Sequence, residues 1–145
     1  MNILIVDDDR FMRGMLFQMV NNIAKHEVSF VTNGHSAVSL LVDPVHGFDL
    51  VFIDLRMPRL NGDKVIEIIQ DMMTNVHFVV LTGRPSDFPN LPKHIQIVQK
   101  PFDYSVIEQI IRGKESSLKG RCKTPAVQNR QSRGLNQIPN PQPVS

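Results

Sequence analysis

The feature that most constrains this chain is a repeated alternation of short apolar runs with segments of helical periodicity. Five runs of strand type occur at residues 3–6, 27–31, 49–53, 76–81 and 95–98. Amphipathic segments with apolar residues every three or four positions lie at 11–23, 37–41, 65–73 and 106–111. Alternation of this kind predicts an α/β domain in which five parallel strands form one sheet, covered by helices on both faces.

The connection between the fourth and fifth runs breaks the pattern. Residues 84–93 contain Pro85, Pro89 and Pro92. Proline lacks a backbone donor and clashes inside a helix, so these three residues leave room for little more than one helical turn. The sequence therefore predicts a short or degenerate fourth helix.

Polar residues stand at the ends of four apolar runs. The central run, 49–53, stops at Asp54, and the others end in Asp7-Asp8-Asp9, Thr82-Gly83 and Lys100-Pro101. The carboxyl ends of parallel strands meet at one edge, where open α/β folds bind ligands, so these side chains are expected to converge there. Asp9 also precedes the first helical segment, and we interpret it as a helix N-cap.

Three carboxylates gathered at one edge repel one another unless a cation lies among them. Oxygen ligands at a solvated edge favour Mg²⁺, which commonly completes its shell with water and phosphate. A metal bound by Asp7, Asp8 and Asp54 could neutralise an incoming phosphoryl group. Lys100 could balance the charge of another phosphoryl oxygen, and the Thr82 hydroxyl could donate to a third.

With these residues in order, the sequence resembles the receiver domain of two-component response regulators. The matching pieces cover residues 1 to about 112 and are Ile-Val-Asp-Asp at 5–8, Asp54 with Met57-Pro58 and Asn61-Gly62, Leu81-Thr82-Gly83, and Lys100-Pro101-Phe102. Each piece is weak alone, but all of them together and in the family's order are specific. The likeness extends to single-domain receivers of the chemotaxis and sporulation-relay types.

The resemblance implies a flavodoxin-like, doubly wound sheet of order 2-1-3-4-5 and phosphorylation of Asp54 by a histidine kinase or histidine phosphotransfer protein. The domain would be a signalling phosphoacceptor that catalyses only its own phosphorylation and dephosphorylation. Lys100 and Thr82 would take the phosphate-binding and switching roles, with a cis peptide before Pro101. The implied Mg²⁺ ligands are Asp7, Asp8, Asp54 and the backbone carbonyl of Arg56.

Two positions depart from the family pattern. Many receivers carry an aromatic residue three positions before the active-site lysine, and here that residue is Ile97. The usual coupling between the threonine and that aromatic ring is therefore not expected. The proline-rich segment 84–93 replaces most of a helix that normally contributes to partner binding, which predicts an altered output face.

The last part of the chain differs in composition from the rest. Up to Ile111 the chain has nine Lys or Arg against thirteen Asp or Glu, whereas residues 112–145 have seven against one. We expect a receiver domain at 1–112, with its last helix ending before Gly113, and a basic, disordered Pro/Gln/Asn-rich tail at 113–145. The tail's charges are spread out, so a nucleic-acid partner is not favoured.

The remaining features concern location. Cys122 is the only cysteine, which excludes an intrachain disulfide and fits a reducing cytoplasm. The N-terminus lacks the basic start and long apolar core of a signal peptide, and no window reaches transmembrane length. The sequence predicts a cytoplasmic protein without membrane insertion.

Several alternatives remain open at this point. The residues after 111 are too few and too polar for a second domain with its own core, which favours a stand-alone receiver acting through an unknown downstream protein. The chain could instead be the N-terminal receiver of a longer regulator, or a pseudo-receiver that binds partners without phosphate. A haloacid-dehalogenase-type phosphatase would use Asp7 and Asp9, but it leaves Asp54 unexplained.

Overall fold

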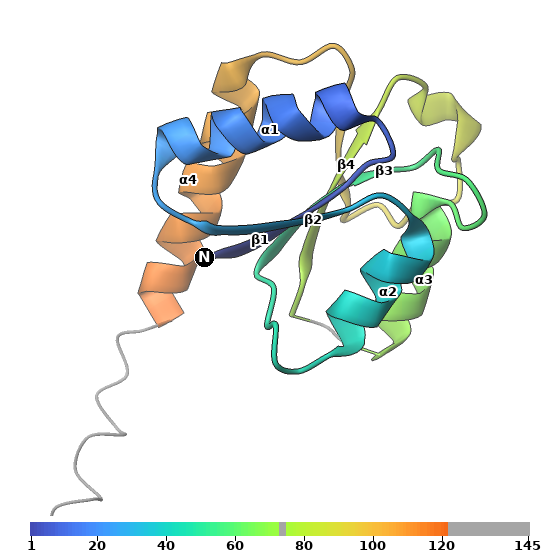
Figure 1. Cartoon of the computed structure of the whole chain (residues 1–145), viewed down its shortest axis with the longest axis horizontal. Coiled ribbons are helices and arrows are strands. Elements are labelled where there is room, and N and C mark those ends of the chain that lie inside the picture. The colour runs from blue at the N-terminus through green and yellow to red at the C-terminus, as the bar shows by residue number, and fades with distance from the viewer. Residues whose placement is uncertain (73–74, 122–145) are drawn as a thin grey trace, which may run out of the picture.

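The computed structural model describes residues 1–72 and 75–121, which form an α/β sandwich around one parallel sheet (Figure 1). The strand order is β2-β1-β3-β4-β5. This confirms the flavodoxin-like topology predicted from the sequence. The strands are β1 (Asn2–Val6), β2 (Glu27–Val31), β3 (Leu50–Asp54), β4 (His77–Thr82) and β5 (Gln96–Gln99).

The helices cover the two faces of the sheet in pairs. Figure 1 places α1 and α4 on one face, and α2 and α3 on the other. Two hydrophobic clusters match these pairs, because alternate residues of each strand point to opposite faces. The helices are α1 (Arg10–Ile23), α2 (Gly34–Val42), α3 (Gly62–Met72) and α4 (Tyr104–Arg121), with a 3₁₀ turn, η1, at Pro85–Asp87.

The central strands form the core of the sheet. In β3, Leu50, Val51, Phe52 and Ile53 are completely buried, as expected for a strand with helices on both faces. The parallel register sets Asp54, the last residue of β3, opposite Leu81 of β4. Thr82 is in turn opposite Gln99 of β5. The ends of three strands are thereby aligned at the same edge.

Two local predictions are confirmed. The Asp9 side chain accepts hydrogen bonds from the backbone N–H groups of Phe11 and Met12, so it caps α1. Between β4 and β5 the described chain forms only η1, a three-residue turn with Pro85 at its start. The prolines of this segment therefore limit the fourth crossover to one short turn, as the sequence indicated.

The predicted end of the last helix is wrong. The structure continues α4 through Gly113 to Arg121, so residues 113–121 are helical and not part of a disordered tail. A glycine costs a helix interior about 1 kcal/mol, and the apolar face of α4, where Ile107, Ile110 and Ile111 pack into the core, offsets that cost. Glu108 accepts hydrogen bonds from the Arg112 guanidinium, and the Ser116 hydroxyl donates to the Arg112 carbonyl. The rest of the predicted tail, 122–145, lies outside the described residues.

None of the helices in the described part of the chain has the length and apolar character needed to cross a bilayer.

Candidate functional site

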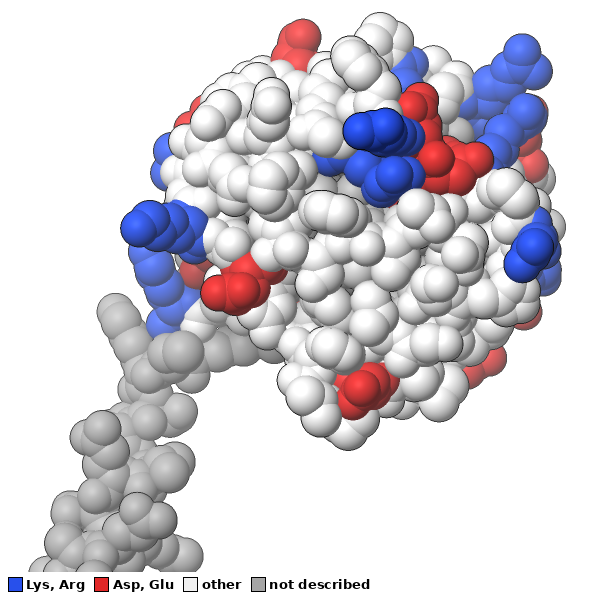
Figure 2. Space-filling view, in the orientation of Figure 1, with Lys and Arg blue, Asp and Glu red and all other residues white. Residues whose placement is uncertain are grey.

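The carboxyl edge of the sheet brings the three predicted acids together. Asp7 and Asp8 follow β1, Asp54 ends β3, and one ligand oxygen from each lies within 4.8 Å of the other two. Asp7 is 1% exposed, whereas Asp8 is open to solvent. Figure 2 shows acidic and basic side chains gathered at this edge, near the start of α1. The cluster has one buried wall and one side that water can reach.

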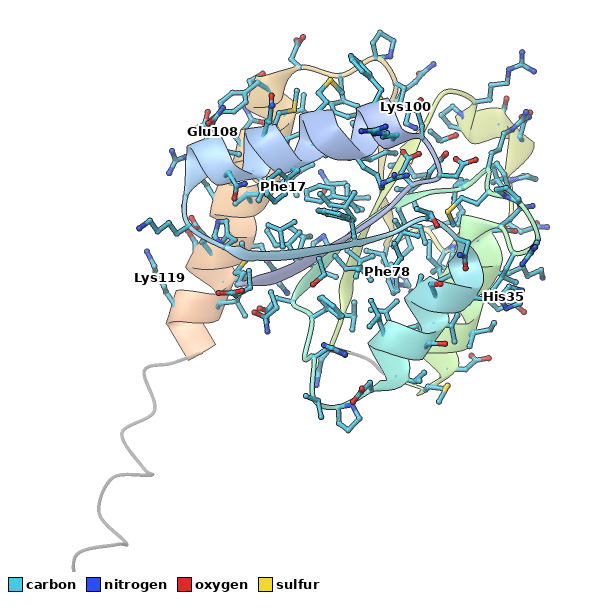
Figure 3. All side chains as sticks on the ribbon, in the orientation of Figure 1. Phe17, His35, Phe78, Lys100, Glu108 and Lys119 are labelled. Atoms are coloured by element: carbon cyan, nitrogen blue, oxygen red, sulfur yellow. The ribbon has the colours of Figure 1, made fainter. Side chains whose placement is uncertain are left out.

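Lys100 supplies a cation to this cluster. It follows β5, and Figure 3 shows its side chain beside the first turn of α1. Its Nζ lies 3.3 Å from Asp7 Oδ2 and 3.8 Å from Asp54 Oδ2. The Lys100–Pro101 peptide is cis, as the resemblance implied. One ammonium group therefore faces two of the three carboxylates.

Thr82 lies between the strands that carry Asp54 and Lys100. It is 2% exposed, and its carbonyl accepts a hydrogen bond from the Lys100 N–H at 2.8 Å. Its hydroxyl oxygen accepts from the Arg84 N–H at 3.2 Å. Because the oxygen acts as the acceptor in that bond, the hydroxyl proton can still be donated to a ligand.

The environment of Asp54 opposes its negative charge. Burial raises the pKa of the Asp54 carboxyl above its ordinary value, the Lys100 ammonium acts to lower it, and the Asp7 carboxylate raises it further. The Arg56 N–H donates to Asp54 Oδ1 at 3.3 Å and favours the charged form. The site therefore has an excess of negative charge that an added cation would relieve.

Two hydrogen-bond donors hold Asp7 in place, and the sequence pattern assigned this role to neither of them. The Arg13 guanidinium donates to the Asp7 carbonyl at 2.9 Å from the second turn of α1. The Asp9 N–H donates to Asp7 Oδ1 at 2.8 Å. The second of these is a local turn typical of Asp, but nothing in the sequence pattern marked Arg13 as facing the site.

Gly62 also supports the site, in a structural role that the sequence did not indicate. A Cβ atom on Gly62 would lie 2.2 Å from the backbone oxygen of Asp54. The Gly62 N–H also donates to the Leu55 carbonyl at 2.9 Å. The first turn of α3 thus rests directly on the end of β3, which a side chain at residue 62 would prevent. In the sequence, Asn61-Gly62 stood out only as one of the motifs that mark the family.

The donor set fits a hard divalent cation. Asp7, Asp8 and Asp54 offer carboxylate oxygens, which Mg²⁺ prefers, and the exposed side allows bound water. Three carboxylates against one ammonium group leave a net negative charge, so the site is electrostatically suited to accept a metal ion as well as Lys100.

The fold and the site together define a flavodoxin-like domain whose acidic centre lies at the carboxyl edge of its central strands. The family model for the response regulator receiver domain matches residues 3–112, and the chain belongs to that family.

Relatives of known sequence agree with this assignment. An uncharacterized response regulatory protein of Staphylococcus epidermidis is 31% identical over 116 residues, covering 75% of this chain and 44% of that protein. Chemotaxis protein CheY of Thermotoga maritima is 33% identical over 81 residues, covering 56% of this chain and 66% of that protein. The chain thus spans less than half the length of the staphylococcal relative.

Solved structures with similar folds include a response regulator receiver domain protein from Clostridium thermocellum. It has a TM-score of 0.72 at 18% identity and covers 83% of this chain and 98% of that one. A two component transcriptional regulator AraC from Clostridium phytofermentans has a TM-score of 0.71 at 24% identity and covers 86% and 99%. Because both identities are below 25%, these structures support the fold alone.

Proposed function

We propose that this receiver domain is a phosphoacceptor, phosphorylated on Asp54 by a histidine kinase or histidine phosphotransfer protein, and that it signals through phosphate-dependent binding of a downstream protein. The observation that carries the proposal is the meeting of Asp54 with two further carboxylates and the Lys100 ammonium at one partly solvated edge. A packing role alone does not require three acids within 4.8 Å of one another.

In the proposed reaction Asp54 is the nucleophile. One of its carboxylate oxygens attacks the phosphorus of a phosphohistidine, and the P–N bond breaks. The electron pair returns to the imidazole nitrogen, which takes up a proton. Lys100 would neutralise a phosphoryl oxygen, and the Thr82 hydroxyl would donate to another. The chain's contribution is mainly the positioning of charge, and its turnover is limited to its own aspartyl phosphate.

Mg²⁺ is the proposed cofactor, held by the carboxylates of Asp7, Asp8 and Asp54 and the backbone carbonyl of Arg56. When bound, it would supply positive charge against both the carboxylates and the transferred phosphoryl group. Asp7 is fixed for this role by the hydrogen bonds from Asp9 and Arg13 to its side chain and carbonyl.

A hollow on the surface of α1 favours the proposal that the phosphodonor docks through a helix. Phe11 is 77% exposed, and with Gly14, Met15 and Gln18 it borders a shallow, open hollow on the helix surface. A Cβ at Gly14 would meet nothing within 4 Å, so the helix surface is open between the larger side chains. Because this hollow also borders Asp9, directly after the acidic pair, a helix docked there could bring its phosphohistidine to the site.

The test is the intact mass of the full chain after incubation with acetyl phosphate and Mg²⁺. One added phosphoryl group is expected in the parent and in Asp71→Asn, an exposed acid of α3, but not in Asp54→Asn. No adduct in the parent, without faster hydrolysis of acetyl phosphate, would instead favour a pseudo-receiver. Phe11→Ser should slow transfer from a phosphorylated histidine phosphotransfer protein while leaving the acetyl phosphate reaction unchanged.

The phosphatase alternative is weakened by Asp9. That class would require the Asp9 carboxylate beside Asp7 at the reaction centre. Instead, Asp9 Oδ1 accepts a hydrogen bond from the Phe11 N–H at 2.8 Å and caps the helix.

We also propose a cytoplasmic location. The proposed phosphoacceptor role is the same for a receiver that acts alone and for the receiver domain of a longer regulator. We propose that the receiver comprises the family match at 3–112 and the remainder of α4, up to Arg121.

A further inference from the structure

An ion pair joins two loops at the edge where the acidic site lies. The Arg56 guanidinium, in the loop after β3, pairs with the Asp87 carboxylate at the end of η1. These residues are 31 positions apart in the chain. Arg56 is also two residues beyond Asp54, to which its backbone N–H donates. The pair therefore connects the immediate neighbourhood of Asp54 to the segment that replaces the fourth helix.

Arg56 has a short path to the site. Leu55 is fully buried, whereas the Arg56 side chain is 59% exposed, so burial alternates along the chain from Asp54 to Arg56. The strand ends at Asp54 and the chain bends at Leu55, where the Arg56 N–H donates to Asp54 Oδ1 at 3.3 Å, so the base of the Arg56 side chain lies close to that carboxylate. The Arg56 guanidinium therefore needs only rotations of its own side chain to turn from Asp87 towards the Asp54 carboxylate.

The pair is suited to exchange. Ion pairs between exposed side chains contribute little to stability, because water and salt screen them. A phosphoryl group carries close to two negative charges and three acceptor oxygens, and Arg binds such groups in bidentate geometry. Arg56 would thus gain a stronger partner than Asp87 when Asp54 carries a phosphoryl group.

Asp87 is equally well placed to transmit the exchange. Backbone hydrogen bonds within the segment are few: the Asp87 N–H donates to Arg84 and the Phe88 N–H to Pro85, each at 3.2 Å, and the Leu91 N–H donates to Phe88 at 3.5 Å. Phe88 and Leu91 pack against the core cluster on the α3 face. Together with α3, residues 87–92 border a groove of about 260 Å³. A movement of Asp87 would therefore change the shape of this groove.

We propose that Asp87 is a positioning residue, which holds Arg56 away from Asp54 until a phosphoryl group arrives. Arg56 then leaves Asp87 for the phosphoryl oxygens, and the freed segment 85–92 changes its packing along α3. This inference rests on the proposed function, because it requires Asp54 to accept a phosphoryl group. It adds a specific link between that event and the surface beside α3.

The test is a double-mutant cycle in the full chain with beryllium trifluoride and Mg²⁺ as the phosphoryl mimic. Parent, Asp87→Asn, Arg56→Gln and the double variant are compared for mimic affinity and for the amide signals of Phe88 and Leu91. Removal of the competing carboxylate should tighten binding about two- to fivefold, the range that corresponds to an exposed ion pair. Arg56→Gln should weaken binding, and Asp87→Asn should add nothing in that background.

The amide signals provide a readout that affinity alone does not. In the parent, Phe88 and Leu91 should shift when the mimic binds, and free Asp87→Asn should already resemble the loaded parent at these positions. Arg56→Gln should bind the mimic without that shift. Asp63→Asn, an equal loss of charge in the same groove, serves as the control and should leave mimic affinity unchanged.

The outcomes separate the two proposals. If Asp87→Asn tightens binding equally with and without Arg56, the effect is that of charge at a distance and the positioning role is overturned. The same holds if the mimic binds the parent but Phe88 and Leu91 do not respond. If the parent with Mg²⁺ does not bind the mimic at all, the proposed function fails and this inference fails with it.

Discussion

Gly62→Ala is the substitution whose effect the structure defines most sharply. A Cβ at this position would lie 2.2 Å from the Asp54 backbone oxygen and 3.0 Å from both the Asp54 carbonyl carbon and Leu55 Cα. Carbon atoms in good contact are about 3.5–4.0 Å apart, so the helix start or the strand end must move by about 1 Å. All three neighbours are backbone atoms, which have no alternative rotamer to adopt.

The expected cost follows from that overlap. Adding a methyl group to a closely packed site typically costs about 1–3 kcal/mol, and rigid neighbours place Gly62→Ala near the upper value. For a folded unit of this size, about 3 kcal/mol corresponds to a fall in Tm of about 10 °C. The displaced atoms belong to Asp54 itself, so Mg²⁺-dependent phosphorylation by acetyl phosphate should also slow.

Urea unfolding of the full chain measures the loss of stability in Gly62→Ala directly. Two other glycines provide matched controls. Gly14 and Gly113 are helical, and a Cβ on either meets nothing within 4 Å. Replacing each with Ala should stabilise the protein by up to about 1 kcal/mol through helix propensity. A Gly62→Ala variant within about 0.5 kcal/mol of the parent would refute the reasoning, because the close approach of α3 to β3 would then not exist.

Three further outcomes are expected from urea unfolding. In the absence of Mg²⁺ at pH 7, Asp54→Asn should be more stable than the parent. Folding raises the pKa of the Asp54 carboxyl, which means that the folded state disfavours the charged form. This cost to the stability of the parent grows as pH rises through the raised pKa. A less stable Asn variant would contradict this. Lys100→Met should lose about 2–4 kcal/mol because it leaves the buried Asp7 carboxylate without its cation, and saturating Mg²⁺ should restore part of the loss. No recovery with Mg²⁺ would count against the metal site. Burial and the N-terminal ammonium lower the pKa of His26, against the opposing pull of Glu115. As pH falls, His26 therefore becomes protonated in the unfolded chain before it does so in the folded chain. The free energy of unfolding should fall as pH drops from 7 to 5, and it should depend less on pH in His26→Gln. An unchanged profile in that variant would assign the slope to other groups.

Much of the fold could be predicted because its signals are local. Each apolar run needed only its own residues to identify it as a strand, and the three prolines of 84–93 were enough to indicate the short turn at η1. The strand ends then placed Asp7, Asp54 and Lys100 at one edge, since the parallel topology determines where such ends meet. Their distances confirm that convergence.

The parts that sequence reasoning missed depend on contacts between distant residues. Gly113 looked like a helix terminator, but α4 continues past it to Arg121. In these further turns, Glu115 Oε1 lies 3.2 Å from Nε2 of the buried His26 ring. The Arg56–Asp87 pair joins two loops that no sequence period relates. In both cases the deciding partner becomes visible only when the chain is folded.

The direction of α4 determines how the molecule can be held in an experiment. This helix starts at the edge that carries Asp54, and its 18 residues extend about 27 Å towards the opposite edge. Cys122, the only thiol in the sequence, follows its last residue directly. A maleimide-coated sensor would therefore capture every copy through the same residue, which follows the end of α4 remote from the acidic centre. Binding traces from such a surface should describe one population attached through a single site.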